Sequence, residues 1–193
     1  FIESDPGASI VYGQKTKNKE ELQEMINQDK WDDIYKKYPV ADGDFVYLPA
    51  GCLHAMGKGN VVYEIQQSTD VTYRFYDYHR KDKDGNEREL HLKQAIDCLS
   101  FDKNIDKNDV HPVVKVHENM KETTFISNDS FTVSQLLVIG KCQYKCDNYQ
   151  LATVVKGSGK VDEYDVKVGD NFLIPTNTSI EFDGQMMIMM TTK

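Results

Sequence analysis

Residues 43–54 read GDFVYLPAGCLH, and residues 169–180 read GDNFLIPTNTSI, with the same order of turn, apolar run and proline. Gly and Asp are typical of a tight turn, the apolar residues of a strand, and Pro of a strand end. The two stretches therefore predict two copies of one small β-barrel unit. The copies differ at their last residue, because His54 in the first is replaced by Ile180 in the second.

Short strands and a few helices are predicted outward from these two stretches. The apolar periodicity predicts helices at residues 18–30, 31–38 and 90–99, the first of them capped by Asn18, and strands at 8–12, 44–49, 60–67 and 70–78. Residues 104–112 are polar and lack periodicity, which is typical of a linker. After Pro112 the chain shows only strand patterns, and in Met186–Met190 we expect alternate side chains to point into a barrel rather than to form a soft binding surface.

The composition excludes several classes of partner. The 193 residues include 23 Lys and Arg against 31 Asp and Glu, a formal net charge of −8. Binding to nucleic acid or to an anionic membrane needs clustered cations, so neither is expected, whereas an anionic small molecule needs only a local basic pocket. No apolar run is long enough to span a membrane. Four scattered cysteines indicate the reduced thiols of a cytoplasmic protein.

The first copy carries a recognisable metal-site pattern. Gly43, Pro49, Gly51 and His54 fall at G-x5-P-x-G-x2-H, which resembles the second motif of the cupin superfamily, in which the His is a metal ligand inside a small β-barrel. A lone His is more often a hydrogen-bonded structural residue. The turn, strand and Pro-x-Gly context favours the ligand here.

The stretch from Leu48 to Leu99 resembles one particular family within the cupin superfamily. LPAGCLHAMGKG, YEIQQSTDVTYRFYDYHR and RELHLKQAID are similar to the zinc-dependent mannose-6-phosphate isomerases of the short bacterial form, and the similarity covers the whole chain in order. It implies an aldose-ketose isomerase that interconverts mannose 6-phosphate and fructose 6-phosphate. It also implies a mainly β fold of two cupin-like antiparallel barrels or jelly rolls, the first incomplete and carrying a small helical insertion. Residues 1–111 would belong to the catalytic cupin half and 112–193 to a degenerate second barrel without metal ligands.

The resemblance also assigns site residues by position. His54 matches the last zinc ligand and Arg74 the catalytic arginine, while Glu64 and Asp70 match acidic residues in or beside the pocket. Lys58 is a candidate for contact with the sugar phosphate. These residue types suit proton transfer through an enediol, because Arg74 stays charged and can stabilise an oxyanion or bind phosphate. Glu64 could shuttle the proton if it is buried, or hold Arg74 by an ion pair.

The early zinc ligands of the family are not found in this sequence. The family uses a Gln and a His from a Q-x-H strand and a later Glu, but no Q-x-H occurs here, and Phe1 aligns just after the position of that Glu. One His cannot hold zinc, since such sites use three or four protein ligands. We therefore expect an N-terminally truncated isomerase chain, with zinc absent or weakly held and no activity of its own.

Other functions and an assembly remain open. A cupin module that binds a sugar phosphate without chemistry would use Arg74 and Lys58 alone. A different metallo-cupin, such as an oxygenase, would need a redox metal. An incomplete first barrel would expose strand edges, through which we expect a homodimer.

Overall fold

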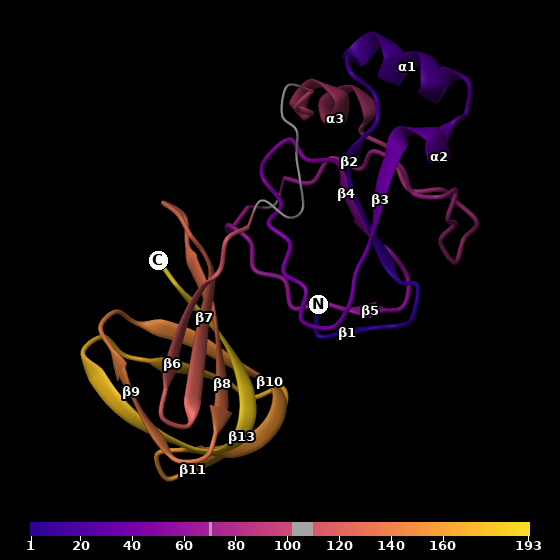
Figure 1. Cartoon of the computed structure of the whole chain (residues 1–193). Helices are drawn as coiled ribbons and strands as arrows, with labels where there is room; N and C mark the ends of the chain where they lie inside the picture. The colour runs from indigo at the N-terminus through magenta and orange to yellow at the C-terminus, as the bar shows by residue number, and fades with distance from the viewer. Residues whose placement is uncertain (70, 102–109) are drawn as a thin grey trace. The chain divides into compact units, whose positions relative to one another are not determined.

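The chain forms two compact units, Phe1–Asp109 and Val110–Lys193 (Figure 1). The structure is a computed structural model and describes residues 1–69, 71–101 and 110–193. The boundary between the units lies two residues before the expected division between 111 and 112. Most of the predicted linker, and the substrate-binding candidate Asp70, lie outside the described residues.

The first unit combines small sheets with short helices. β2 (Ser9–Gln14) is the central strand of one sheet, between β3 (Tyr35–Pro39) and β4 (His54–Met56), and β1 (Glu3–Ser4) pairs with β5 (Asn60–Val61). The helices are α1 (Lys19–Asn27), α2 (Trp31–Ile34) and α3 (Leu92–Cys98). In Figure 1 they lie at one end of this unit, with β1 and β5 at the other. None of the described helices is long and apolar enough to cross a membrane.

Helix α1 begins where the sequence predicts. Asn18 is extended, with φ −153° and ψ 173°, and its side-chain oxygen accepts a hydrogen bond of 2.8 Å from the backbone N–H of Glu21. An N-cap side chain of this kind satisfies an amide that has no partner within the helix.

We expect Asn18→Ala to lower the free energy of unfolding by about 1 kcal/mol, because the cap bond is lost. Urea denaturation followed by Trp31 fluorescence measures this change. Asn27→Ala is the matched control, since Asn27 is an equally exposed asparagine at the other end of α1. Equal destabilisation by the two substitutions would contradict the capping role.

Several predicted elements of the first unit are wrong in extent. The helix expected at 31–38 ends at Ile34, and Tyr35–Pro39 instead forms β3. The backbone of β3 pairs with β2, and this ladder outweighs the weak local helical preference. The strands expected at 44–49 and 70–78 are not formed by the described residues there, and of 60–67 only Asn60–Val61 pairs. An alternating pattern becomes a strand only where a neighbouring backbone supplies hydrogen bonds.

The second unit is one antiparallel sheet. Its strands are β6 (Val113–His117), β7 (Met120–Ser127), β8 (Thr132–Ile139), β9 (Cys142–Cys146), β10 (Gln150–Val161), β11 (Tyr164–Lys167), β12 (Asn171–Ile174) and β13 (Thr178–Thr192). The hydrogen-bonded order is β11-β10-β13-β8-β7-β6, with β12 beside β10 and β9 beside β13. The fold class is therefore mainly β, as predicted. The described strands do not close into a ring, because β6 and β11 end the path.

Strand β13 merges two predicted strands into one. The sequence predicts strands at 179–182 and 185–191 with a turn at Asp183 and Gly184. The structure instead continues through Gly184, whose φ is 146° and which faces Gly159 of β10. A β-carbon on Gly184 would lie 2.6 Å from the Cα of Gly159. Glycine here permits the close approach of β13 to β10, at the point where the other edge of β13 passes from β9 to β8.

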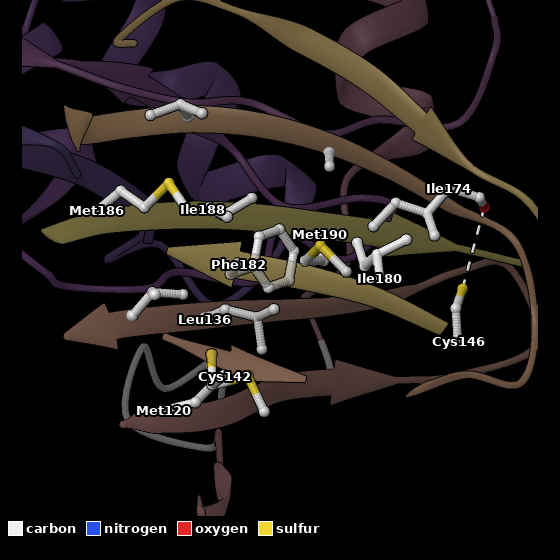
Figure 2. Packing of buried hydrophobic residues seen from close by; sticks show 13 residues of the cluster. Met120, Leu136, Cys142, Cys146, Ile174, Ile180, Phe182, Met186, Ile188 and Met190 are labelled. Atoms are coloured by element: carbon white, nitrogen blue, oxygen red, sulfur yellow. Dashed lines mark hydrogen bonds between the residues drawn. The ribbon is translucent and has the colours of Figure 1, made fainter. Parts of the chain in front are cut away.

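The core of the second unit confirms the expectation for the methionine run. Met186, Ile188 and Met190 of β13 are almost fully buried. Figure 2 shows them in one cluster with Phe182 and Leu136. Alternation along a strand sends these side chains to one face of the sheet, so the run is structural.

The turns that begin the two repeated stretches have the same geometry. In each, the first N–H of the turn donates to the Asp carboxylate and the Asp N–H donates back to the first carbonyl. These distances are 3.1 and 3.1 Å between Ala41 and Asp44, and 2.8 and 3.0 Å between Lys167 and Asp170. The intervening glycine has φ 87° in the first turn and 94° in the second, a conformation that favours glycine.

The two repeated stretches also have equivalent backbone conformations after their prolines. Gly51 and Asn177 both lie in the left-handed region, with φ of 80° and 58°, and Asn tolerates this region better than most residues. Three residues later, His54 is exposed, whereas Ile180 is buried in the core of the second unit. The repeat therefore places an imidazole in the first unit where the second has an apolar core residue.

All four cysteines are free thiols. Cys52, Cys142 and Cys146 are buried, and burial raises the pKa of Cys52 to about 11 and raises the pKa of the other two. Thiols with raised pKa values react slowly, because the thiolate is the nucleophile. In Figure 2 the Cys146 thiol lies 3.9 Å from the carbonyl oxygen of Ile174.

Candidate active site

His54 lies at the start of β4, opposite Tyr12 of β2. The loop before it is packed closely: a β-carbon on Gly51 would lie 2.9 Å from the carbonyl oxygen of Cys98, at the end of α3. The Nδ1 atom of His54 is 3.0 Å from the carbonyl oxygen of Cys52. Because a carbonyl only accepts, this bond assigns the proton to Nδ1. The Nε2 lone pair of the exposed imidazole is then available for a metal ion or a donor.

The described residues do not supply a complete metal site. Among residues 1–69, 71–101 and 110–193, no group of three or more His, Cys, Asp or Glu side chains is placed to hold a metal ion. Protein zinc sites use three or four such ligands. His54 fits as one ligand, but the described residues by themselves do not fit zinc.

Arg74 is held by the segment 89–91. Its Nη1 atom donates a 2.8 Å hydrogen bond to the carbonyl oxygen of Glu89. Its backbone N–H donates to Nδ1 of His91 at 3.1 Å, and the His91 N–H donates to the Arg74 carbonyl at 2.8 Å. The guanidinium is planar with five donors, so it retains donors for an anionic ligand.

The residues after Arg74 are anchored by aromatic packing instead of strand pairing. Phe75 is buried, and the ring of Tyr76 stacks on Trp31 of α2 with 4.2 Å between centroids and 11° between planes. Phe75 meets the same indole edge-on at 5.8 Å. These contacts hold Phe75 and Tyr76 against α2. Arg74, which is half-buried, directly precedes them in the chain.

A buried carboxylate follows three residues after Arg74. Asp77 accepts hydrogen bonds from the guanidinium groups of Arg80 and Arg88, and we name these three residues the Asp77 cluster. The hydrogen bonds from Arg88 and then Arg80 hold the pKa of the Asp77 carboxyl well below its usual range. This cluster was not predicted from the sequence. The available signal was an Asp within an aromatic run followed by two arginines, a pattern that does not reveal burial.

The two other site candidates that the structure describes, Lys58 and Glu64, are exposed. Lys58 lies between Gly57 and Gly59, and a β-carbon on Gly57 would lie 2.2 Å from the carbonyl oxygen of Ser9. Glu64 lies in a segment without regular structure, and the burial expected for a proton shuttle is not provided by the described residues. No ion pair between Glu64 and Arg74 is found among the described residues, where the Arg74 guanidinium donates to the Glu89 carbonyl.

The described structure does not bring the predicted site residues into direct polar contact with one another. No hydrogen bond or ion pair between described residues joins His54, Lys58, Glu64 and Arg74 to one another. Each is held separately by its own backbone surroundings. The assignments of His54, Arg74, Glu64, Lys58 and Asp70 to a common site therefore remain predictions.

Comparison with known proteins identifies the relatives. The family model described as "Mannose-6-phosphate isomerase, cupin domain" matches residues 121–192. The chain is 38% identical over 194 residues to a mannose-6-phosphate isomerase of Streptococcus mutans and 37% identical over 183 residues to mannose-6-phosphate isomerase ManA of Bacillus subtilis. These matches cover 97% and 91% of this chain but 60% and 56% of the relatives.

A solved structure agrees over the full length of this chain. The crystal structure of mannose 6-phosphate isomerase from Bacillus subtilis matches with a TM-score of 0.93 and 30% identity, covering 100% of this chain and 62% of the other. The antiparallel sheet, the repeated turns and the family model define a cupin protein. Within that class, the chain is similar over its whole length to mannose-6-phosphate isomerases. It spans about 60% of the length of the relatives that it matches.

Proposed function

We propose that the gene product is an aldose-ketose isomerase that interconverts mannose 6-phosphate and fructose 6-phosphate. The observation that carries this proposal is the similarity to mannose-6-phosphate isomerases across nearly the whole chain, at 38% identity over 97% of its residues. The match to a solved isomerase at a TM-score of 0.93 supports it.

The residues take distinct roles in this proposal. Arg74 stabilises the negative oxygen of the enediol or binds the sugar phosphate, because its guanidinium is charged at any working pH. Glu64 moves the proton between C1 and C2, and Lys58 and Asp70 contact the substrate. His54 serves as one metal ligand through Nε2, the nitrogen that the Cys52 carbonyl leaves free. We propose zinc as the metal, with the further ligands lying outside the described residues.

A second candidate is a cupin module that binds a sugar phosphate without chemistry. The observation that favours it is the incomplete ligand set, since His54 is not joined by two further ligands among the described residues. Binding to Arg74 and Lys58 would not require a metal. An oxygenase has no such support, because the relatives are isomerases.

A coupled assay of mannose 6-phosphate turnover tests the proposal. It compares the zinc-loaded gene product with the same protein after a chelator has removed the zinc. We expect mannose 6-phosphate turnover that disappears with the metal and returns when zinc is added. Sugar-phosphate binding without turnover in the zinc-loaded gene product would support the binding module instead. The 193-residue chain is assayed in parallel, and we expect it to show neither turnover nor stoichiometric zinc.

We further propose a cytoplasmic location, in keeping with four free thiols, and a homodimer through a strand edge. The expectation from the sequence placed that edge in the incomplete first barrel, whereas the edge proposed here, β6, belongs to the second unit. β6 pairs only with β7 among the described strands, and all five of its residues are exposed. An open edge with exposed Val113, Val114 and Val116 is a template for a second strand.

We expect Val114→Pro to weaken self-association, because proline removes an edge N–H. Sedimentation velocity across a range of concentrations measures the change. Val168→Pro is the control, since Val168 is also exposed but lies outside the strands. A gene product that stays monomeric at all concentrations would contradict the dimer.

A further inference from the structure

Among residues 1–69, 71–101 and 110–193, Asp77 is the one buried charged residue, and the proposed mechanism does not use it. The side chain of Asp77 is only 6% exposed, whereas those of Arg80 and Arg88 are 64% and 48% exposed. A carboxylate removed from water is costly unless it is paired and hydrogen-bonded. Asp77 therefore holds its two partners at fixed positions.

The two arginines bind Asp77 through different contacts. Arg88 donates from Nε to Oδ2 at 2.7 Å and from Nη2 to Oδ1, which is the bidentate fork geometry. Arg80 donates from Nε to Oδ1 at 3.1 Å, from Nη2 to the same oxygen, and from its backbone N–H to the Asp77 carbonyl at 3.0 Å. A bidentate pair restrains both the position and the plane of a guanidinium.

These contacts hold in place an exposed hairpin formed by residues 78–89. Lys81 and Glu87 form an antiparallel bridge, and residues 78–89 are all exposed, so no apolar core fixes the hairpin. Arg80 and Arg88 lie at its two ends, and Asp77 joins them. Further contacts between described residues are less directional: the rings of Tyr78 and His79 lie 4.9 and 5.5 Å from that of Tyr76 between centroids, and His79 lies 3.5 Å from Glu87.

The hairpin in turn carries the group that holds Arg74. Glu89 follows Arg88 directly, and its carbonyl accepts the hydrogen bond from Nη1 of Arg74. Hydrogen bonds between Arg74 and His91 also join the two ends of the segment 74–91, which contains the hairpin. A shift of the Arg88 end would therefore move the Glu89 carbonyl and release the guanidinium.

We propose that Asp77 is a positioning residue for Arg74: by holding Arg80 and Arg88 it fixes the hairpin and the Glu89 carbonyl that orients the Arg74 guanidinium. This inference rests on the proposed function, in which Arg74 acts on the substrate. A misplacement of about 1 Å in a group that acts on substrate can lower a rate by about 100-fold.

Steady-state kinetics of Asp77→Asn in the zinc-loaded gene product tests the proposal. We expect kcat to fall by about 10- to 100-fold with a small change in KM. Hydrogen exchange should show faster exchange of the backbone amides of residues 78–91. Asp97→Asn is the matched control, because Asp97 is also paired with two cations, Lys19 and Lys93, but lies exposed on α3, and its kcat should not change.

A double-mutant cycle with Arg74→Ala separates positioning from a general loss of structure. If Asp77 acts through Arg74, Asp77→Asn should have no further effect on kcat once the Arg74 side chain is absent. If the fold-decreases in kcat caused by Asp77→Asn and Arg74→Ala instead multiply in the double variant, the two residues act independently and the inference is overturned. If Asp77→Asn does not fold, Arg88→Lys is used, which keeps the charge but loses the fork and should lower kcat in the same direction.

The outcomes distinguish this inference from the function on which it rests. If Arg74→Ala leaves kcat unchanged, the proposed role of Arg74 fails, and the inference fails with it. If Arg74→Ala lowers kcat but both Asp77→Asn and Arg88→Lys leave it unchanged, only the positioning inference is overturned.

Discussion

Arg74→Ala is expected to lower kcat of the zinc-loaded gene product by about 10²- to 10³-fold, the effect of removing one donor to a developing oxyanion. The structure gives the physical reason, since the half-buried guanidinium is held by one Nη1 bond to Glu89 and keeps other donors for a ligand. Initial rates with mannose 6-phosphate, measured over a range of substrate concentrations, separate kcat from KM. A change confined to KM would indicate that Arg74 contributes to ground-state phosphate binding alone.

Two further variants control this prediction. Arg74→Lys keeps the charge but not the planar fork, so its kcat should lie between those of the wild type and Arg74→Ala. Lys93→Ala removes an exposed cation from α3 and should leave kcat unchanged. Wild-type kcat in Arg74→Ala would refute the assigned role, provided that zinc content and folded fraction match the wild type.

Phe182→Ala is expected to lower the free energy of unfolding of the unit Val110–Lys193 by about 3–5 kcal/mol. Phe182 is fully buried in the cluster of Figure 2 and lies 6.1 Å from Tyr144 between ring centroids. Its removal loses apolar burial and leaves a cavity that strands on both sides cannot fill without distortion. Native-state hydrogen exchange of the amides in β8, β10 and β13 measures the change.

Tyr164→Ala is the matched control for the core substitution. Tyr164 is an aromatic residue in the same sheet, but it is 67% exposed, so its removal should change stability by less than about 0.5 kcal/mol. Similar effects of the two substitutions, or a loss below about 1 kcal/mol for Phe182→Ala, would show that this cluster does not stabilise the unit as a packed core.

Features that depend on neighbouring residues could be predicted from the sequence. The Asn18 cap and the glycine turns at Gly43 and Gly169 all formed as expected. Each is decided within a few residues, by a side chain that satisfies a nearby N–H or by a glycine that permits positive φ. The burial of alternate residues in Met186–Met190 could be predicted for the same reason, because successive side chains of a strand point to opposite faces.

Features that depend on a distant backbone could not be predicted. Tyr35–Pro39 joins a sheet instead of continuing α2, because β2 offers it hydrogen bonds. Residues 44–49 have a strand pattern but form no regular strand in the described structure. The pairing order β11-β10-β13-β8-β7-β6 of the strands after Pro112 could not be predicted, since it depends on which backbones folding brings side by side.

By itself, then, the sequence determined the mainly β class, the duplicated turn and strand, the contrast between His54 and Ile180, and through resemblance the isomerase family. Tertiary structure alone decided which carbonyl holds the Arg74 guanidinium, and that Asp77 is buried between Arg80 and Arg88. The physical reason is distance along the chain. Turns and caps are set by adjacent residues, whereas the burial of a charge depends on side chains that only folding brings together.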